Sequence, residues 1–305
     1  MYMDVPGKCY HFWLSEGVLK REVEESLTSN HQEADTKMMI HAKAADLAQG
    51  NIVIRASDTD IAVILLYHSA HLQASLWMEV GTVSKNNRRY INITAIANKL
   101  GPKMCSALPA FHAFTGCDYT STFIRKGKVR PYELMSKMPA VQNAFAQIAR
   151  EETTKATTTT LQNFTASIYG AKDGTNLNKH RYQKFEKGYG PKMKGKNPLA
   201  KLKGTEASAI PPCESECNMH IRRVAFVAKM WAKADQLEIR QDPEERNGWQ
   251  LVDGSYVPIW FEGEQLLNGL VPEDDENLED DSDSDETMEL ASSDEESGES
   301  TDEDE

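Results

Sequence analysis

The sequence has few cysteines, no long apolar run and no amino-terminal export signal. Its 305 residues include five Cys, a sparse and odd number that argues against the disulfide framework of a secreted protein. No apolar stretch approaches the ~18–20 residues that span a bilayer. The segment from Met1 to Tyr10 lacks the charged and apolar regions of a signal peptide. We therefore expect a soluble intracellular protein.

Basic side chains are missing from the carboxyl-terminal part of the chain. Residues 273–305 hold 19 Asp or Glu and no Lys or Arg, which leaves residues 1–272 with 34 basic and 28 acidic side chains and a formal charge of +6. A basic body can bind polyanions, whereas the acidic tail repels them and suits basic protein partners. The tail cannot bury enough apolar surface to offset its ordering entropy, so we predict that it is disordered.

Several motifs of known chemistry are also missing. There is no Gly-x-Ser-x-Gly and no Gly-rich nucleotide-binding loop. The spacing Cys213-x3-Cys217-x2-His220 offers three ligands where a structural zinc site needs four. His41 and His112 lie in apolar helical stretches, where a buried, hydrogen-bonded histidine is the expected role.

Hydrophobic periodicity predicts an α/β chain. A helix should begin near Ser29 or Asn30, and short β-branched runs predict strands. Expected strands cover 10–14, 52–56, 75–80 and 89–93; expected helices cover 61–67, 94–99, 103–114, 131–138, 140–149 and 219–237. Residues 153–160 hold six Thr and predict a weak helix or a loop. Glycines and prolines favour a basic loop over 172–203 and an irregular packed segment over 243–272.

Acidic residues stand at three of the expected turns and element ends. They are Glu33, Asp35, Asp58, Asp60 and Asp118. Carboxylates are ligands for Mg²⁺ or Mn²⁺, and two such ions about 3.5–4 Å apart can clamp an in-line displacement at phosphorus. The first pair fits less well, because residues i and i+2 of a regular helix do not face each other. The alternative role is ordinary helix capping, with Asp60 at an N-cap.

The order of three acidic motifs along the chain resembles the motif order of one nuclease family. The motifs are His31-Gln32-Glu33-Ala34-Asp35, Ala56-Ser57-Asp58-Thr59-Asp60 and Thr115-Gly116-Cys117-Asp118-Tyr119. Together they are similar to the internal half of the flap endonucleases and excision-repair nucleases, which have a PIN-like fold. The resemblance is greater still to an uncharacterised, transposon-associated animal branch of that superfamily. Residues that carry this second likeness are His112 to Asp118, Pro211, Pro212, His220, Arg222 or Arg223, and Trp231.

The resemblance implies a domain organisation. A PIN-like three-layer α/β/α domain would cover 28–140, and a helical and irregular continuation with the basic loop would cover 141–272. The disordered acidic tail would follow over 273–305. Residues 1–27 would be a short N-terminal segment, the remnant of a truncated first half.

The resemblance also implies an activity. It is metal-dependent, structure-specific hydrolysis of phosphodiesters in branched or flapped DNA, which implies a nuclear location. By motif match, the five carboxylates would hold two Mg²⁺ or Mn²⁺ ions, and water activated between the ions would attack phosphorus. Side chains after Asp118 would contact the DNA backbone: Arg125, Lys126, Lys128 and Arg130.

One departure from the family pattern keeps a second hypothesis open. Flap-type nucleases have an N-terminal half with further metal-binding Asp residues, and no such motif precedes Glu33 here. The alternative is a catalytically incomplete, transposon-derived PIN-like protein that binds nucleic acid or acts as a scaffold. The two hypotheses share the same fold and differ in whether the carboxylates support chemistry.

Overall fold

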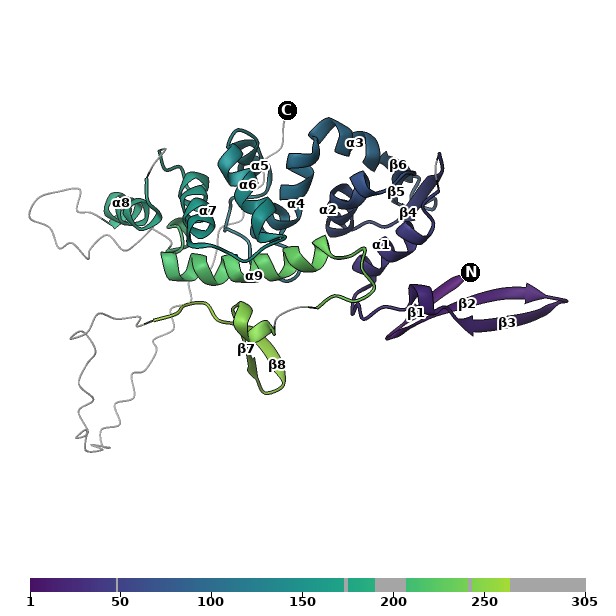
Figure 1. The fold of residues 1–305 in the computed structure, drawn as a ribbon. Coiled ribbons are helices and arrows are strands. Elements are labelled where there is room, and N and C mark those ends of the chain that lie inside the picture. The colour runs from purple at the N-terminus through teal and green to yellow at the C-terminus, as the bar shows by residue number, and fades with distance from the viewer. Residues whose placement is uncertain (48, 173–174, 190–206, 241–242, 264–305) are drawn as a thin grey trace, which may run out of the picture. The chain divides into compact units, whose positions relative to one another are not determined.

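The computed structural model describes residues 1–47, 49–172, 175–189, 207–240 and 243–263, and these form a mixed α/β protein (Figure 1). Met1–Gly263 is one compact unit. None of the helices in these ranges is long and apolar enough to cross a membrane. The predicted acidic tail and the parts 173–174 and 190–203 of the predicted basic loop lie outside the described residues.

An antiparallel sheet of three strands opens the chain. Its strands are β1 (Tyr2–Val5), β2 (Lys8–Ser15) and β3 (Val18–Val23), in the order β1-β2-β3. The predicted strand 10–14 lies inside β2. Gly7 and Gly17 have φ values of +74° and +76° in the two connecting turns, a conformation that glycine adopts without strain. A short 3₁₀ turn, η1 (Glu25–Leu27), then leads toward the first α-helix.

Helix α1 (Ala34–Ala44) begins later than the sequence pattern predicts. The residues expected to start it are held in an extended segment by distant parts of the chain. Asn30 Nδ2 donates to the Ile239 carbonyl (3.0 Å), and His31 Nε2 donates to the Gln236 carbonyl (2.7 Å). Glu33 therefore occupies the N-cap position with extended backbone (φ −109°, ψ 147°).

A second sheet confirms the three strands predicted between residues 52 and 93. It consists of β4 (Asn51–Arg55), β5 (Ser75–Val80) and β6 (Arg89–Asn92), in that order. β4 and β5 are parallel, joined through α2 (Thr59–His68) and η2 (Ser69–His71), and β6 runs antiparallel to β5. Ile54, Leu76 and Met78 are buried in one core with residues of α2, α3 (Ile93–Leu100) and α4 (Pro102–Phe114).

The rest of the body is largely helical. Its helices are α5 (Val129–Ser136), α6 (Pro139–Ile148), α7 (Lys155–Ile168), α8 (Leu177–Tyr189) and α9 (Glu214–Ala232). Short 3₁₀ turns, η4 (Ala207–Ala209) and η5 (Glu244–Asn247), flank the stretch around α9. A small hairpin, β7 (Trp249–Val252) with β8 (Ser255–Pro258), lies in the segment expected to be irregular.

One of these helices lies where the sequence allows a weak helix or a loop, and another lies where a basic loop is predicted. The threonine-rich stretch is helical in α7, where the hydroxyls of Thr158, Thr159 and Thr160 each donate to the carbonyl four residues earlier, at 3.0 Å. Part of the expected basic loop forms α8, because Leu177 and His180 are buried against the body. Tertiary packing has overridden weak local propensity in both places.

Helix α9 packs against α4 and provides much of the core. Val224, Val227, Ala228 and Trp231 are almost fully buried. Buried histidines fix the position of the helix. His220 Nε2 donates to the Phe114 carbonyl at the end of α4 (2.8 Å), and His68 Nε2 of α2 donates to the Trp231 carbonyl (2.9 Å).

We predict that His220 makes the protein lose stability in acid. Burial lowers the pKa of His220 from 6.5 to about 4. Between pH 6.5 and about 4, His220 is therefore protonated in the unfolded chain and neutral in the folded chain. Because protonation favours the unfolded chain, the free energy of unfolding should fall over this pH range by up to about 3 kcal/mol. In urea melts over this range, His220→Gln should show a shallower pH dependence. His71→Gln, at an exposed position, should keep the wild-type dependence; equal slopes for both variants would contradict the assignment.

Candidate metal centre

Two helix N-termini and one turn carry the predicted metal ligands. Glu33 is the N-cap residue of α1, and Asp35 lies in the first turn of that helix. Asp58 is the N-cap of α2, where its Oδ1 accepts the Asp60 backbone N–H at 2.9 Å. The N-cap is thus Asp58 and not Asp60. Helix N-termini favour negative side chains, so this placement offsets part of the cost of gathering the carboxylates.

The remaining carboxylate stands on a tight turn after α4. Cys117 and Thr120 exchange backbone hydrogen bonds at 3.2 Å, which leaves Asp118 and Tyr119 at the tip. Gly116 before the turn has φ +109°, and a Cβ there would lie 2.2 Å from Thr122 Cγ2. Glycine is therefore required at this position, and it directs Asp118 back toward the two helix starts.

Four of the five carboxylates line one open hollow of about 270 Å³, which we call the acidic hollow. Its lining residues are Glu33, Ala34, Asp35, Asp60, Asp118, Tyr119 and Trp231. Asp58 lies outside this lining but close enough for its charge to act on Asp35. The structure thus brings together the residues that the sequence motifs single out, although they lie far apart along the chain.

The environment of the acidic hollow raises the pKa of two of its carboxyl groups. Burial, and then the charges of Asp35, Asp118 and Asp60, raise the pKa of Glu33. Burial, and then Asp58, Asp60 and Asp118, raise the pKa of Asp35. Both groups therefore hold their protons more tightly than usual. A bound cation would reverse this by favouring the ionised forms.

The carboxylates surround the hollow and do not meet at a single point. Among the described residues, the groups of three or more side chains whose ligand atoms all lie within 4.8 Å of one another do not include them. Direct coordination of one ion by several of these side chains would therefore need side-chain rotations or bridging water. Carboxylate oxygens with water are the ligand set that Mg²⁺ and Mn²⁺ prefer, so the residues present fit such an ion.

Asp60 is the most firmly held of the five. It is 8% exposed, and its Oδ1 lies 2.7 Å from His112 Nε2. On the other side of the imidazole, Lys128 Nζ lies 3.4 Å from Nδ1. An ammonium group can only donate, so Nδ1 accepts and the Nε2–H donates to Asp60. His112 is thus buried and hydrogen-bonded as expected, and it also orients a carboxylate of the acidic hollow, leaving Asp60 Oδ2 for a ligand.

Lys128, one of the predicted DNA-backbone contacts, makes hydrogen bonds within the protein. Its ammonium group donates to the His112 carbonyl (3.0 Å), to Thr115 Oγ1 (3.3 Å) and to the Gly116 carbonyl. It therefore pairs with acceptors at the C-terminal end of α4 and is only partly exposed. Lys126 lies 4.4 Å from the centre of the Tyr169 ring, while Arg125 and Arg130 are exposed.

The cysteine–histidine spacing near the start of α9 does not form a shared site. Cys213 caps α9, with its sulfur accepting the Glu216 N–H at 3.4 Å. Cys217 is fully buried beside Thr165, and His220 turns toward α4. The three side chains therefore make separate local contacts.

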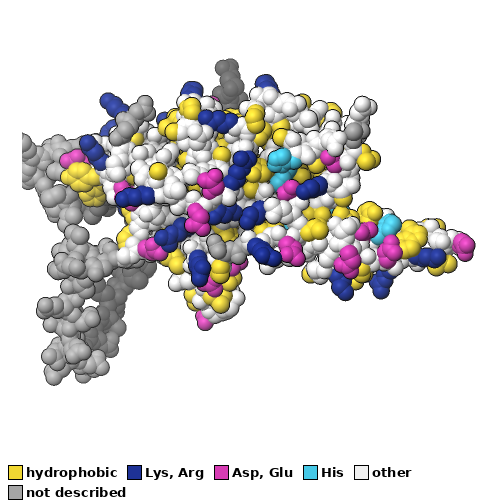
Figure 2. All heavy atoms as spheres, in the orientation of Figure 1, with side chains coloured by type: hydrophobic (Ala, Val, Ile, Leu, Met, Phe, Trp, Pro, Cys, Tyr) yellow, Lys and Arg dark blue, Asp and Glu magenta, His cyan; other side chains and the backbone are white. Residues whose placement is uncertain are grey.

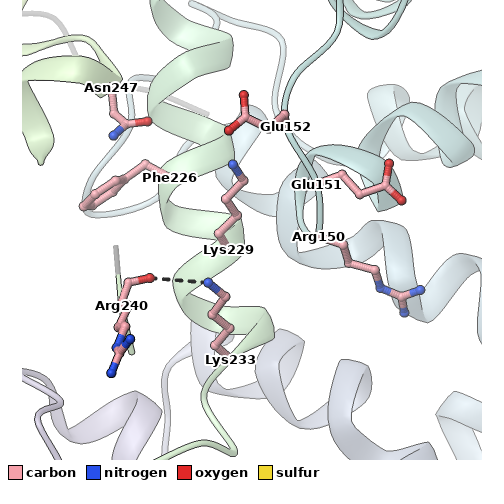
Figure 3. Close-up of a pocket in the computed structure, with 8 residues that line it drawn as sticks. All are labelled: Arg150, Glu151, Glu152, Phe226, Lys229, Lys233, Arg240 and Asn247. Carbon is pink, nitrogen blue, oxygen red and sulfur yellow. Dashed lines mark hydrogen bonds between the residues drawn. The ribbon is translucent and has the colours of Figure 1, made fainter. Parts of the chain in front are cut away.

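A second, basic pocket of about 390 Å³ lies along α9 (Figure 3). It is lined by Arg150, Glu151, Glu152, Phe226, Lys229, Lys233, Arg240 and Asn247. Lys229 and Lys233 project from α9, and Lys233 Nζ donates to the Arg240 carbonyl at 3.4 Å. Figure 2 shows Lys and Arg side chains gathered over this helix, with acidic side chains among them.

The acidic hollow and the basic pocket belong to one continuous surface. A hollow between them shares Glu33 and Tyr119 with the first and Phe226 with the second. Sequence reasoning did not identify Lys229, Lys233 or Tyr119 as site residues. The helical spacing i, i+3, i+7 of Phe226, Lys229 and Lys233 was the available signal, but it is also typical of a solvated helix face.

Comparisons with known proteins leave the site to be interpreted from its own geometry. No protein-family model, no curated protein and no solved structure matches the chain.

We predict that Lys128 contributes to folding and not to phosphate binding. Lys128→Met should lower the free energy of unfolding by about 1–3 kcal/mol, because it removes the Lys128 hydrogen bond to the buried Gly116 carbonyl after α4. Arg130→Met, at an exposed position of the same segment, should change it by less than about 0.5 kcal/mol. Denaturant unfolding without DNA measures both. If the two variants are equally stable, the inward contacts of Lys128 are not significant.

Proposed function

We propose that the protein is a divalent-metal-dependent, structure-specific nuclease-like protein that hydrolyses DNA phosphodiesters. The observation that carries the proposal is the gathering of carboxylates from three distant segments around the acidic hollow. Burial, and then the charges of neighbouring carboxylates, raise the pKa of Glu33 and of Asp35, and a bound cation would offset both effects. The proposal implies action in the nucleus.

The fold is compatible with a PIN-like domain. Asp58 and Asp60 follow the carboxyl end of β4, which pairs in parallel with β5 after the α2 crossover. In open α/β sheets, ligands bind beyond the carboxyl ends of such strands. The same arrangement supports a PIN-like layout over 28–140, with α9 completing the core from the later part of the chain.

Each group of residues has a definite task under this proposal. Glu33, Asp35, Asp58, Asp60 and Asp118 would hold two Mg²⁺ or Mn²⁺ ions, directly or through water. Two such ions, when bound, make water more acidic and offset charge at the leaving oxygen. His112 fixes the orientation of Asp60. Buried Trp231 forms part of the wall of the acidic hollow.

DNA would reach the acidic hollow along α9. The basic pocket offers four cations and two carboxylates, and the intervening hollow connects it to Glu33. Lysine and arginine supply most of the sequence-independent affinity for phosphates. A duplex next to the hollow would thus have its backbone held by Lys229 and Lys233, while exposed Arg125 and Arg130 would extend the contact.

We expect Mg²⁺- or Mn²⁺-dependent cleavage of branched or flapped DNA by the full chain. Asp118→Asn should reduce the cleavage rate by about a hundredfold or more, since even groups that only orient metal ligands contribute 10–100-fold. Asp58→Asn keeps a good N-cap residue but removes the charge, so it should lose activity without unfolding. Glu133→Gln, an exposed carboxylate on α5, is the control and should cleave normally.

The outcome also decides between the two functions considered. If Mn²⁺ raises the melting temperature of the wild type and not of Asp118→Asn, but no DNA is cut, the protein is a catalytically incomplete binding or scaffold protein. The wide spacing of the carboxylates favours this second candidate. If Mn²⁺ neither stabilises the protein nor supports cleavage, the metal centre itself is refuted.

A second experiment concerns the basic pocket. The double variant Lys229→Gln/Lys233→Gln should weaken DNA binding and make the slope of log K against log salt shallower by about 0.9 for each DNA phosphate that the variant no longer neutralises. Lys99→Gln/Lys103→Gln removes the same charge from exposed positions on α3 and α4 and should bind nearly as the wild type does. Fluorescence anisotropy at several salt concentrations measures both. Identical slopes for the two variants would rule out DNA binding at the basic pocket.

A further inference from the structure

A sulfur, a nitrogen and an oxygen ligand meet where the N-terminal sheet contacts α1. Asp4 of β1 and Cys9 of β2 are paired in the strand register, and residues directly opposite in an antiparallel pair place their side chains on the same face. His41 of α1 approaches this pair, with its Nε2 2.6 Å from Asp4 Oδ2. One ligand atom from each of the three residues lies within 4.8 Å of those of the other two.

These distances suit a tetrahedral ion. Zinc lies about 2.0–2.3 Å from nitrogen, oxygen and sulfur ligands, which puts the ligands roughly 3.3–3.8 Å from one another. The Asp4–His41 contact is shorter than that, so an ion would enter by parting these two side chains by less than about 1 Å. Cys9 is fully buried, while the Asp4 and His41 side chains are 25% and 30% exposed. Solvent therefore reaches the group from one side, where water would complete the coordination.

The donor set differs in kind from that of the acidic hollow. Thiolate and imidazole are soft or borderline ligands that select Zn²⁺ over Mg²⁺, whereas the acidic hollow offers carboxylates alone. We propose that Asp4, Cys9 and His41 bind one Zn²⁺ ion, which fastens the N-terminal sheet to α1. This site is independent of the proposed nuclease function.

The contacts of the sheet with the body show which elements such an ion, with three protein ligands and water at the open fourth position, would hold together. Cys9 belongs to a small buried cluster with Leu27 and Ile40, separate from the main core. Beyond that cluster, the Cys9 N–H donates to Thr28 Oγ1 at 3.2 Å, and the Tyr2 ring lies 6.3 Å from that of His41. An ion held by β1, β2 and α1 would join all three elements at one point.

An ion-free account of the same geometry exists, and it makes a different prediction. A hydrogen bond from His41 Nε2 to Asp4 would also explain the short contact, with the Cys9 thiol as a neighbour. In that account the sulfur binds no metal. The two accounts therefore differ in whether a metal–thiolate bond forms at Cys9.

Cobalt substitution distinguishes the two accounts in the full chain. Metal-free protein titrated with Co²⁺ should develop the near-ultraviolet sulfur-to-cobalt charge-transfer band at one equivalent, and Zn²⁺ should abolish it by displacement. Cys9→Ser should lose the band. Cys213→Ser, which keeps a side-chain oxygen at the α9 cap, should retain it. Asp4→Asn and His41→Gln should weaken Co²⁺ binding at least tenfold.

Two further measurements keep the test decisive. If Cys9→Ser fails to fold by circular dichroism, the surface variant Asp4→Asn decides through its Co²⁺ affinity. Asp118→Asn and excess Mg²⁺ should leave the band unchanged, which separates this site from the acidic hollow. A wild type without the band, or a band that persists in folded Cys9→Ser, would overturn the proposal.

Discussion

The packing of α9 against α4 is the contact on which the rest of the structure depends. The buried face of α9 supplies Trp231 to the wall of the acidic hollow, and the His220–Phe114 hydrogen bond fixes the end of α4 from which the Asp118 turn begins. The opposite face presents Lys229 and Lys233 to the basic pocket. Arg223, 2% exposed, donates to the Gly248 and Ile259 carbonyls and so attaches the β7–β8 hairpin. One helix therefore sets the relative positions of both candidate binding surfaces.

A group of carboxylates this close is tolerated because the fold offsets part of its electrostatic cost. The N-termini of α1 and α2 place the positive ends of two helix dipoles beside the charges. Asp60 is neutralised in part by the Nε2–H of His112. Burial and the remaining repulsion raise the pKa of Glu33 and of Asp35. Under the proposed function, a bound ion would favour the ionised forms of these two groups, which would couple ion binding to stability.

Local patterns were sufficient to predict the elements that depend on local chemistry. The strands β4, β5 and β6 were predicted almost to the residue, because β-branched runs between turns are visible in a short window. The start of α1 was not, because Asn30 and His31 are bonded to residues more than 200 positions later. The inward turn of Lys128 could not be predicted either, since a lysine in a basic loop looks the same whether it meets carbonyls or solvent.

Whether a candidate site could be predicted from the sequence likewise depended on whether its residues form local motifs. The acidic residues could be selected from the order of their motifs, and the structure brings four of the five to one hollow. The Asp4–Cys9–His41 group had no sequence signal, because it depends on the register of β1 with β2 and on how α1 meets that sheet. Spacing along the chain reveals ligands within one element or motif, whereas ligands joined by strand pairing become visible only in three dimensions.

The late position of α9 has a consequence for biosynthesis. The apolar side of α4 is complete at Phe114, yet Trp231 and its neighbours leave the ribosome more than a hundred residues afterwards. At about 5–20 residues per second, the nascent chain exposes that surface for roughly ten seconds. During this interval the nascent chain exposes an apolar surface that can bind other proteins. The yield of folded protein in a cell should therefore depend on chaperones that cover α4 until α9 has been synthesised.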